Sequence, residues 1–349
     1  LAQLYKEKDP LYGGYRGGPA YYIHAYVEEK QKKKRNKVVI SVLFAISGLI
    51  CWCGISHVIS NSVVSSFKNA FSIPPIYTTV VLVAVAAVIV LRKDATVKIL
   101  DMVVPVMAVC YFAITILIIV MNIGSIPGVF ARIFQEAFGF RQVAAGGFGA
   151  VLMNGIKRGL FSNESGMGSA PIAAAAAQTR NPVRQALVSS TGTFWDTVVV
   201  CLMTGLVLVT SIMKNPSIDM GNITDGGVLT TLAFQQIPGL GPVILVVGII
   251  SFAYSTVLGW AYYGERCVEY FSGKKGLIPY RVLYIAVAAI APVISLNLVW
   301  TVADILNALM AIPNLIAVLL LSNVIIKETQ KYINDLDARD DTPVEVIDK

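Results

Sequence analysis

Seven stretches of this chain contain no lysine, arginine, aspartate or glutamate and are about long enough to cross a membrane. They cover residues 38–67, 70–91, 102–131, 197–213, 226–264, 282–303 and 305–326. Hydrocarbon offers no water to backbone N–H and C=O groups, so such segments cross it as helices. Together with a hydrophobic fraction of 56% and a charged fraction of 14%, these stretches predict an all-α polytopic membrane protein.

One further crossing is predicted to be discontinuous. Residues 142–156 and 165–179 are uncharged but short, and the polar residues Lys157, Arg158 and Glu164 separate them. Non-helical backbone survives at membrane depth only where protein or a water-filled cavity surrounds it, and such broken helices bind ions and solutes in transporters. We expect residues 159–168 to be unwound, which brings the count to eight crossings.

The cations lie at the ends of the apolar segments, and the net charge of +7 therefore indicates topology and not nucleic-acid binding. The positive-inside rule predicts that both termini are cytoplasmic, with 1–37 a cytoplasmic connection, 38–326 the transmembrane domain and 327–349 a cytoplasmic tail. The basic run 30–37 is first a topology signal, with a specific anionic-lipid site as the alternative. The five cysteines lie in or beside apolar spans and indicate neither disulfides nor a metal site.

Residues 155–171 resemble the signature of the sodium:alanine (alanine/glycine:cation) symporter family, with Ser165 where the family usually has alanine. Four further segments are similar to family motifs: 17–23, 194–197, 260–265 and 309–314. The resemblance implies the amino acid-polyamine-cation superfamily and its inverted-repeat, leucine-transporter-like fold. It also implies that three helices precede Leu1, so the chain is expected to be an N-terminally truncated member.

A substrate site is expected at the break. Glycines allow the backbone to unwind and a ligand to approach, and the free backbone groups of half-helices face the charges of an amino acid. Phe161 is expected to cap the pocket, while Ser162, Asn163 and Gly166 contact substrate or ion. Ser60 stands where the family commonly has a glutamine near the substrate; hydroxyls of that helix could equally bond across packed helices.

The coupling ion is expected to be sodium, with no cofactor. In the fold that the family resembles, a Ser/Thr pair on the eighth core helix helps to hold one sodium ion, and Ser255 and Thr256 fall at that place. Hydroxyls that bond only to their own helix would fit these positions too.

Two acidic residues in apolar surroundings are candidates for function because charge is costly there. For Glu164 the functional interpretation is a cation ligand or a gate. The structural interpretation, which is slightly favoured, is an internal ion pair with Arg158 or Lys157. Asp196 is either functional or part of a polar network. Asn314, after Pro313, is expected to bond backbone groups that the proline frees.

The residues alone predict a polytopic carrier with a broken helix. The resemblance implies a cell-membrane symporter that couples sodium entry to uptake of a small neutral amino acid, alanine or glycine, by alternating access. The alternatives are proton coupling through Glu164 and Asp196, and a non-transporting fragment. An intramembrane enzyme is disfavoured, since the chain has no His-Glu-x-x-His or Gly-x-Ser-x-Gly motif and only two histidines. The sequence indicates no particular oligomeric state.

Overall fold

A computed structural model describes most of the chain, and the described part is almost entirely helical. It covers residues 1–9, 14–91, 93–138, 147–179, 181–215, 226–237, 239–290 and 296–334. Its one pair of strands within these ranges is a short antiparallel hairpin of β1 (Glu7–Lys8) and β2 (Tyr15–Arg16). The all-α prediction is therefore confirmed.

Five helical stretches in the described residues are long and apolar enough to cross a membrane. They are Val39–Lys68, Met102–Met121, Pro182–Lys214, Leu240–Ile290 and Trp300–Leu320. The fourth contains two successive helices, and a shorter apolar helix covers Pro75–Val88. The protein is thus polytopic, while the count of eight crossings and the inverted repeat remain predictions.

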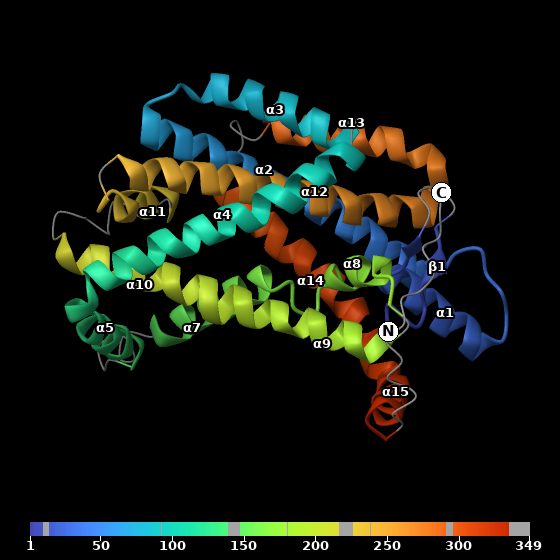
Figure 1. Cartoon of the computed structure of the whole chain (residues 1–349). Helices are drawn as coiled ribbons and strands as arrows, with labels where there is room; N and C mark the ends of the chain where they lie inside the picture. The colour runs from blue at the N-terminus through green and yellow to red at the C-terminus, as the bar shows by residue number, and fades with distance from the viewer. Residues whose placement is uncertain are drawn as a thin grey trace.

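Helix α2 (Val39–Phe71) is the central element (Figure 1). It packs against α12 (Leu240–Ser272) and α14 (Leu296–Leu320), and α1 (Pro19–Gln31) covers its beginning. The core between them contains Phe44, Trp52, Cys267, Ala303 and Met310, all nearly inaccessible to solvent. These three helices form the wall on which the candidate site lies.

Four further helices, α3 (Pro75–Leu91) with α13 (Leu277–Ile290) and α4 (Lys93–Met121) with α10 (Leu202–Lys214), extend this wall (Figure 1). Helix α3 runs beside α13, and α4 packs against α12 and α10. Residues 93–101 belong to the same helix as the apolar span that follows them, and α4 accommodates Pro105 without a break.

The predicted discontinuous helix is present. Helix α7 (Gly147–Ser162) ends at the polar stretch, and α8 (Ala170–Ala176) follows it. The break begins at Asn163, four residues later than the expected residue 159, because Asn163 still donates its backbone N–H to the Gly159 carbonyl at 3.1 Å. Residues 142–146 of the expected first leg lie outside the described residues.

The remaining elements follow in order around this centre. Helix α4 is followed by a 3-10 turn (Ile123–Ser125) and by α5 (Ile126–Phe138). Helix α8 is followed by α9 (Pro182–Thr193), the π-helical segment η2 (Phe194–Cys201), α10 and α11 (Gly226–Phe234). A 3-10 turn, η3 (Gly273–Gly276), joins α12 to α13, and α15 (Ser322–Asn334) ends the described chain. Helices α9, η2 and α10 form one continuous rod (Figure 1).

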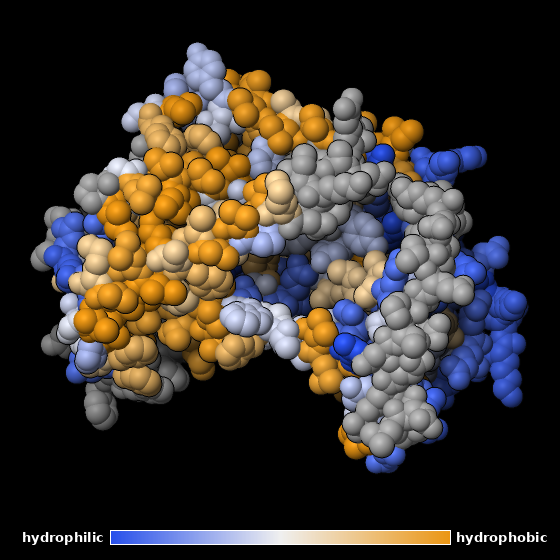
Figure 2. All heavy atoms as spheres, viewed as in Figure 1, coloured by the Kyte–Doolittle hydropathy of each residue, from blue (hydrophilic) through white to orange (hydrophobic). Residues whose placement is uncertain are grey.

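Hydrophobic side chains cover much of the outer surface, as expected for helices that face lipid. Figure 2 shows them gathered over the side where α4 and α10 lie, whereas hydrophilic residues collect near the N-terminal segment and α1. Residues such as Val109, Val188 and Leu319 are more than half exposed. The surface therefore separates into an apolar flank and a polar end.

Close packing of α12 on α13 depends on Gly264. A Cβ atom there would lie 1.9 Å from the hydroxyl oxygen of Tyr280, a buried residue. We expect Gly264→Ala to lower the stability of the purified protein by about 1–3 kcal/mol, because the ring must move in a packed core. Melting of the protein in detergent measures the effect.

Two matched variants test this cause. Gly54→Ala adds the same methyl group to a helix position with nothing within 4 Å, and should not destabilise. Adding Tyr280→Phe to Gly264→Ala removes the clashing oxygen and should recover part of the loss. An equal loss in Gly54→Ala would show that the packing argument is wrong.

Candidate substrate and sodium site

The break between α7 and α8 is a tight turn with backbone conformations that glycine favours. Glu164, Gly166 and Gly168 have φ angles of 50°, 76° and 90°. At Gly168 a Cβ atom would lie 2.5 Å from Pro19 and 3.0 Å from Phe44, so this position also allows close approach to α1 and α2. The glycines therefore let the turn pack directly against the helical wall.

One side of the turn is held by α14. The side-chain amide of Asn314 donates to the Gly166 carbonyl at 2.8 Å, and the Tyr22 hydroxyl donates to the Asn314 side-chain oxygen. Asn314 is 3% exposed. Asn314 was expected to bond backbone groups freed by Pro313, and this is wrong about the partner: the carbonyl that it bonds belongs to the break between α7 and α8 and not to its own helix.

The other side of the turn is held by η2. The Ser162 hydroxyl donates to the Asp196 carboxylate at 2.6 Å, and the Asn163 amide donates to Thr197 Oγ1 at 2.5 Å and to the Gly159 carbonyl at 3.0 Å. Asp196 thus belongs to a polar network around the break. The Asn163 side-chain oxygen is buried and, within the described part of the chain, accepts no hydrogen bond.

A cavity of about 450 Å³ opens beside the break. Five residues singled out from the sequence line it: Phe161, Ser162, Glu164, Ser255 and Thr256. The remaining lining residues are Ile55, Val58, Ile59, Gly259, Trp260 and Tyr263. The structure therefore brings the expected substrate-binding turn and the expected sodium-binding hydroxyls to one cavity, which has the size of a small-molecule site.

Glu164 is bonded within this wall. Its carboxylate oxygens accept hydrogen bonds from the Ser169 hydroxyl at 2.5 Å and from the Trp260 indole at 2.9 Å. The slightly favoured pairing with Arg158 or Lys157 is wrong, because within the described residues the carboxylate bonds Ser169 and Trp260 instead. The Arg158 guanidinium lies 3.8 Å from Asp304 and 4.0 Å from the centre of the Trp300 ring.

Ser255 and Thr256 both donate to the Phe252 carbonyl, at 2.8 and 2.9 Å. This is the pattern of hydroxyls bonded to their own helix. A hydroxyl that donates one hydrogen bond keeps two acceptor lone pairs, and both residues line the cavity. The back-bonds therefore orient the hydroxyls and leave them able to ligate a cation.

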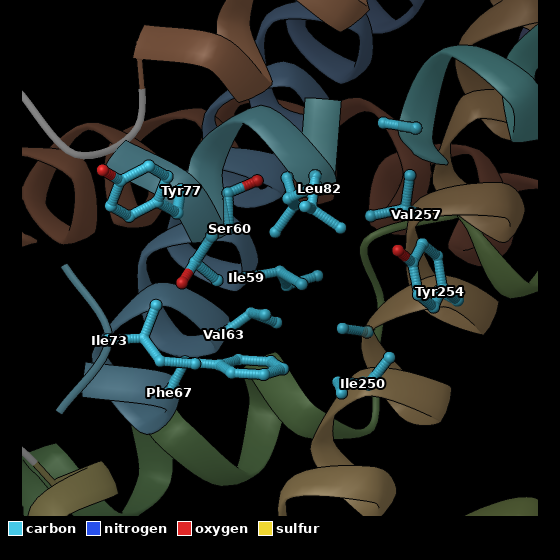
Figure 3. Close-up of a pocket in the computed structure, with 14 residues that line it drawn as sticks. Ile59, Ser60, Val63, Phe67, Ile73, Tyr77, Leu82, Ile250, Tyr254 and Val257 are labelled. Atoms are coloured by element: carbon cyan, nitrogen blue, oxygen red, sulfur yellow. The ribbon is translucent and has the colours of Figure 1, made fainter. Parts of the chain in front are cut away.

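Ser60 lies elsewhere. It lines a separate cavity of about 300 Å³ between α2, α3 and α12 (Figure 3), and its hydroxyl donates to the Ser56 carbonyl at 2.8 Å. The lining of that cavity is almost wholly apolar. Asn163, Gly166 and Asp196 also lie outside the lining of the first cavity, where they hold the break in place.

A model of the sodium:alanine symporter family matches residues 1–346. The chain belongs to this family. A sodium/alanine symporter, AgcS, from Methanococcus maripaludis is 43% identical over 95% of this chain and 72% of the relative. From Bacillus subtilis, the amino-acid carrier protein AlsT is 35% identical (95% and 69% covered) and the probable sodium/glutamine symporter GlnT is 37% identical (95% and 67% covered).

Membership of the sodium:alanine symporter family makes this chain a multi-pass membrane transporter and not an enzyme. The cavity beside the broken helix is the natural candidate for its binding site. Sequence reasoning assigned no role to Trp260 or Tyr263 in this cavity. Trp260 follows Thr256 by four residues, and this spacing alone predicts that the two side chains share one face of a helix.

The Trp260–Glu164 hydrogen bond connects α12 to the break, and its contribution is measurable. Trp260→Phe removes the indole donor and leaves a carboxylate oxygen in the cavity wall without that partner. We expect each of Trp260→Phe and Glu164→Gln to destabilise the protein, with a coupling energy of about 1–3 kcal/mol in the double variant. Chemical or thermal unfolding in detergent measures it, and strictly additive effects would contradict the link.

Proposed function

We propose that this protein couples the entry of sodium to the uptake of a small neutral amino acid, alanine or glycine. One observation carries the proposal: the end of the first leg of a broken helix, with Glu164 just beyond it, lines the same cavity as Ser255 and Thr256. A shared cavity is what coupling needs, because each ligand can then change the affinity for the other. The similarity to the sodium/alanine symporter AgcS and to the probable sodium/glutamine symporter GlnT supports this class of transport.

The chemistry of the turn suits a zwitterion and a monovalent cation. Helix α7 ends at Ser162, and the carbonyl end of a helix carries partial negative charge that attracts an ammonium group or sodium. Hydroxyl and carbonyl oxygens together would form a weak neutral cage for sodium, which suits binding followed by release.

Aromatic rings stand over the cavity on one side. The Phe161 ring lies 5.1 Å from Trp300 and 6.5 Å from Trp260, between centroids, and the Arg158–Asp304 pair continues this layer. We infer that this thin layer separates the cavity from one side of the membrane, the outer side if both termini are cytoplasmic.

A thicker, charged layer closes the opposite side. Arg266 contacts Asp9 at 2.5 Å and Glu269 at 2.9 Å, all three buried, and Arg16 pairs with both Glu269 and Glu7. Under the proposal, these ion pairs must separate when the site opens to the cytoplasm. The N-terminal segment would then act as the inner barrier of alternating access.

Uptake of radiolabelled alanine into proteoliposomes tests the proposal. We expect an inward sodium gradient to drive uptake, glycine to compete, and collapse of the pH gradient to have no effect. Uptake that follows the pH gradient and ignores sodium would favour the proton-coupled alternative, for which Glu164 is the titratable group in the cavity. The absence of both alanine uptake and stabilisation by alanine with sodium, in correctly folded protein, would contradict the alanine assignment.

A binding arm separates transport from ligand recognition. Protection of the purified chain from thermal unfolding by alanine with sodium, but without uptake, would support the non-transporting alternative for residues 1–349. The same uptake assay is repeated on the chain extended by any residues encoded upstream of Leu1. Uptake of alanine only by the extended chain would indicate that residues 1–349 bind without transporting, and no uptake by either would indicate a different substrate.

The role of Thr256 is tested by Thr256→Val, which keeps the shape and removes the oxygen. We expect the sodium concentration for half-maximal uptake to rise about tenfold, equivalent to roughly 1.4 kcal/mol for one lost ligand. Ser251→Ala is the matched control: its hydroxyl also donates to its own helix, at 2.9 Å to Val247, and is not in the cavity lining. Equal shifts in both variants would show a general effect on α12.

A further inference from the structure

Two basic segments are exposed at the same polar end of the molecule. The first is the connection from α1 to α2, where Lys32, Lys33, Lys34, Arg35 and Lys37 are all exposed. The second is η3, between α12 and α13, which exposes Lys274 and Lys275. Figure 2 shows hydrophilic residues concentrated along this edge.

The first segment is held in a defined conformation. The Arg35 backbone N–H donates to the Glu28 carboxylate at 2.5 Å, and His24 Nε2 lies 3.0 Å from the Arg35 carbonyl. The same backbone hydrogen bond lowers the pKa of Glu28 from its ordinary value, which keeps this anchor ionised. The main chain is thus fixed by its neighbours while the lysine side chains point to solvent.

The first segment also touches the helix that leads to the second. Lys37 Nζ donates to the Phe271 carbonyl at 2.6 Å, and the Val38 backbone N–H donates to the Tyr270 hydroxyl at 3.3 Å. Phe271 lies in the last turn of α12, three residues before Lys274. The two basic segments therefore form one surface, which we call the basic rim.

Each half of the basic rim leads directly into an apolar surface. Val39, the first residue of α2, is 72% exposed, and Ile278, the second residue of α13, is 71% exposed. Leu43 on α2 and Val282 on α13 continue these faces, at 57% and 62% exposed. Helices that expose such residues face acyl chains, so the basic rim lies at the depth of the lipid headgroups.

We propose that the basic rim is a binding site for anionic phospholipid headgroups, formed jointly by residues 32–37 and by Lys274 and Lys275. Within the described part of the chain, Lys33, Lys274 and Lys275 make no ion pair with a carboxylate, so their charges are available to a phosphate. Each such lysine near an anionic surface strengthens binding about fivefold. The inference does not depend on the transported substrate.

Purified protein in neutral detergent provides the test, because topology during insertion then plays no part. Phosphatidylglycerol or phosphatidylcholine is titrated in mixed micelles, and the rise in melting temperature gives an apparent affinity. We expect phosphatidylglycerol to stabilise the wild-type protein more than phosphatidylcholine does, with an effect that weakens in added potassium chloride.

Paired variants locate the site. Lys33→Gln with Lys34→Gln, and separately Lys274→Gln with Lys275→Gln, should each weaken the phosphatidylglycerol effect on the order of tenfold. Lys33→Arg with Lys34→Arg should retain it. The control is Lys327→Gln with Lys331→Gln, which removes two exposed charges from α15 and should change little.

Three results would overturn the proposal. Equal stabilisation by phosphatidylcholine would show that the protein does not distinguish an anionic headgroup from a zwitterionic one. Equal losses in the α15 control would show a general effect of net charge. Full stabilisation by soluble glycerol 3-phosphate would indicate a site for free anions and not for a lipid surface.

Discussion

The structure depends on how the backbone at the break in the α7–α8 helix finds its hydrogen-bond partners. At membrane depth an unpaired N–H or C=O costs several kcal/mol. Local turns pair several N–H groups of the break, such as those of Glu164 and Met167, and side chains supply further partners. Asn314 supplies one to the Gly166 carbonyl, and Asn163 returns to the Gly159 carbonyl on α7. Glycines at 166 and 168 then permit the positive φ angles that this turn requires. The packing of α2, α12 and α14 places those partners within reach.

The turn is anchored differently on its two faces. Toward α14 the contacts are neutral and buried, from Asn314 and Tyr22. Toward η2 they run through Ser162 and Asp196, and Ser162 is exposed. The π-helical geometry of η2 is uncommon and concentrates at functional sites, and here it turns Asp196 and Thr197 toward the break. A structural role for Asp196 is therefore compatible with a site at this point, since the site depends on the turn that Asp196 holds.

The amino-acid pattern was sufficient to predict the helical, membrane-spanning fold class and the position of the break. Long uncharged runs and a charged, glycine-rich interruption are compatible with few backbone structures inside a membrane. The pattern also predicted five residues that share the cavity. It failed at Glu164, where proximity in sequence suggested Arg158. Helix α7 ends at Ser162, so Glu164 lies in the turn and not on the helix that carries Arg158. The partners of Glu164 are Ser169, at the end of the break, and Trp260, 96 residues away. Long-range contacts of this kind are fixed by tertiary packing. The same holds for Ser60, whose side of α2 faces α3 and not the break.

The contacts also indicate which leg of the broken helix is free to move under the proposed mechanism. The second leg is fixed at its end, where the Gln3 amide donates to the Ala177 carbonyl at 2.9 Å and Lys6 donates to the Ala177 and Thr179 carbonyls at 3.2 and 3.3 Å. The segment that carries Gln3 and Lys6 is itself bound to α12 through the buried Asp9–Arg266 pair. Removing one member of a buried pair strands a charge, so this end resists small displacements. By contrast, α7 is exposed along most of its described side chains and is held chiefly near Ser162. Opening on the side of Phe161 therefore disrupts fewer contacts than opening on the side of Arg266, and occupancy of the cavity is expected to act first on α7.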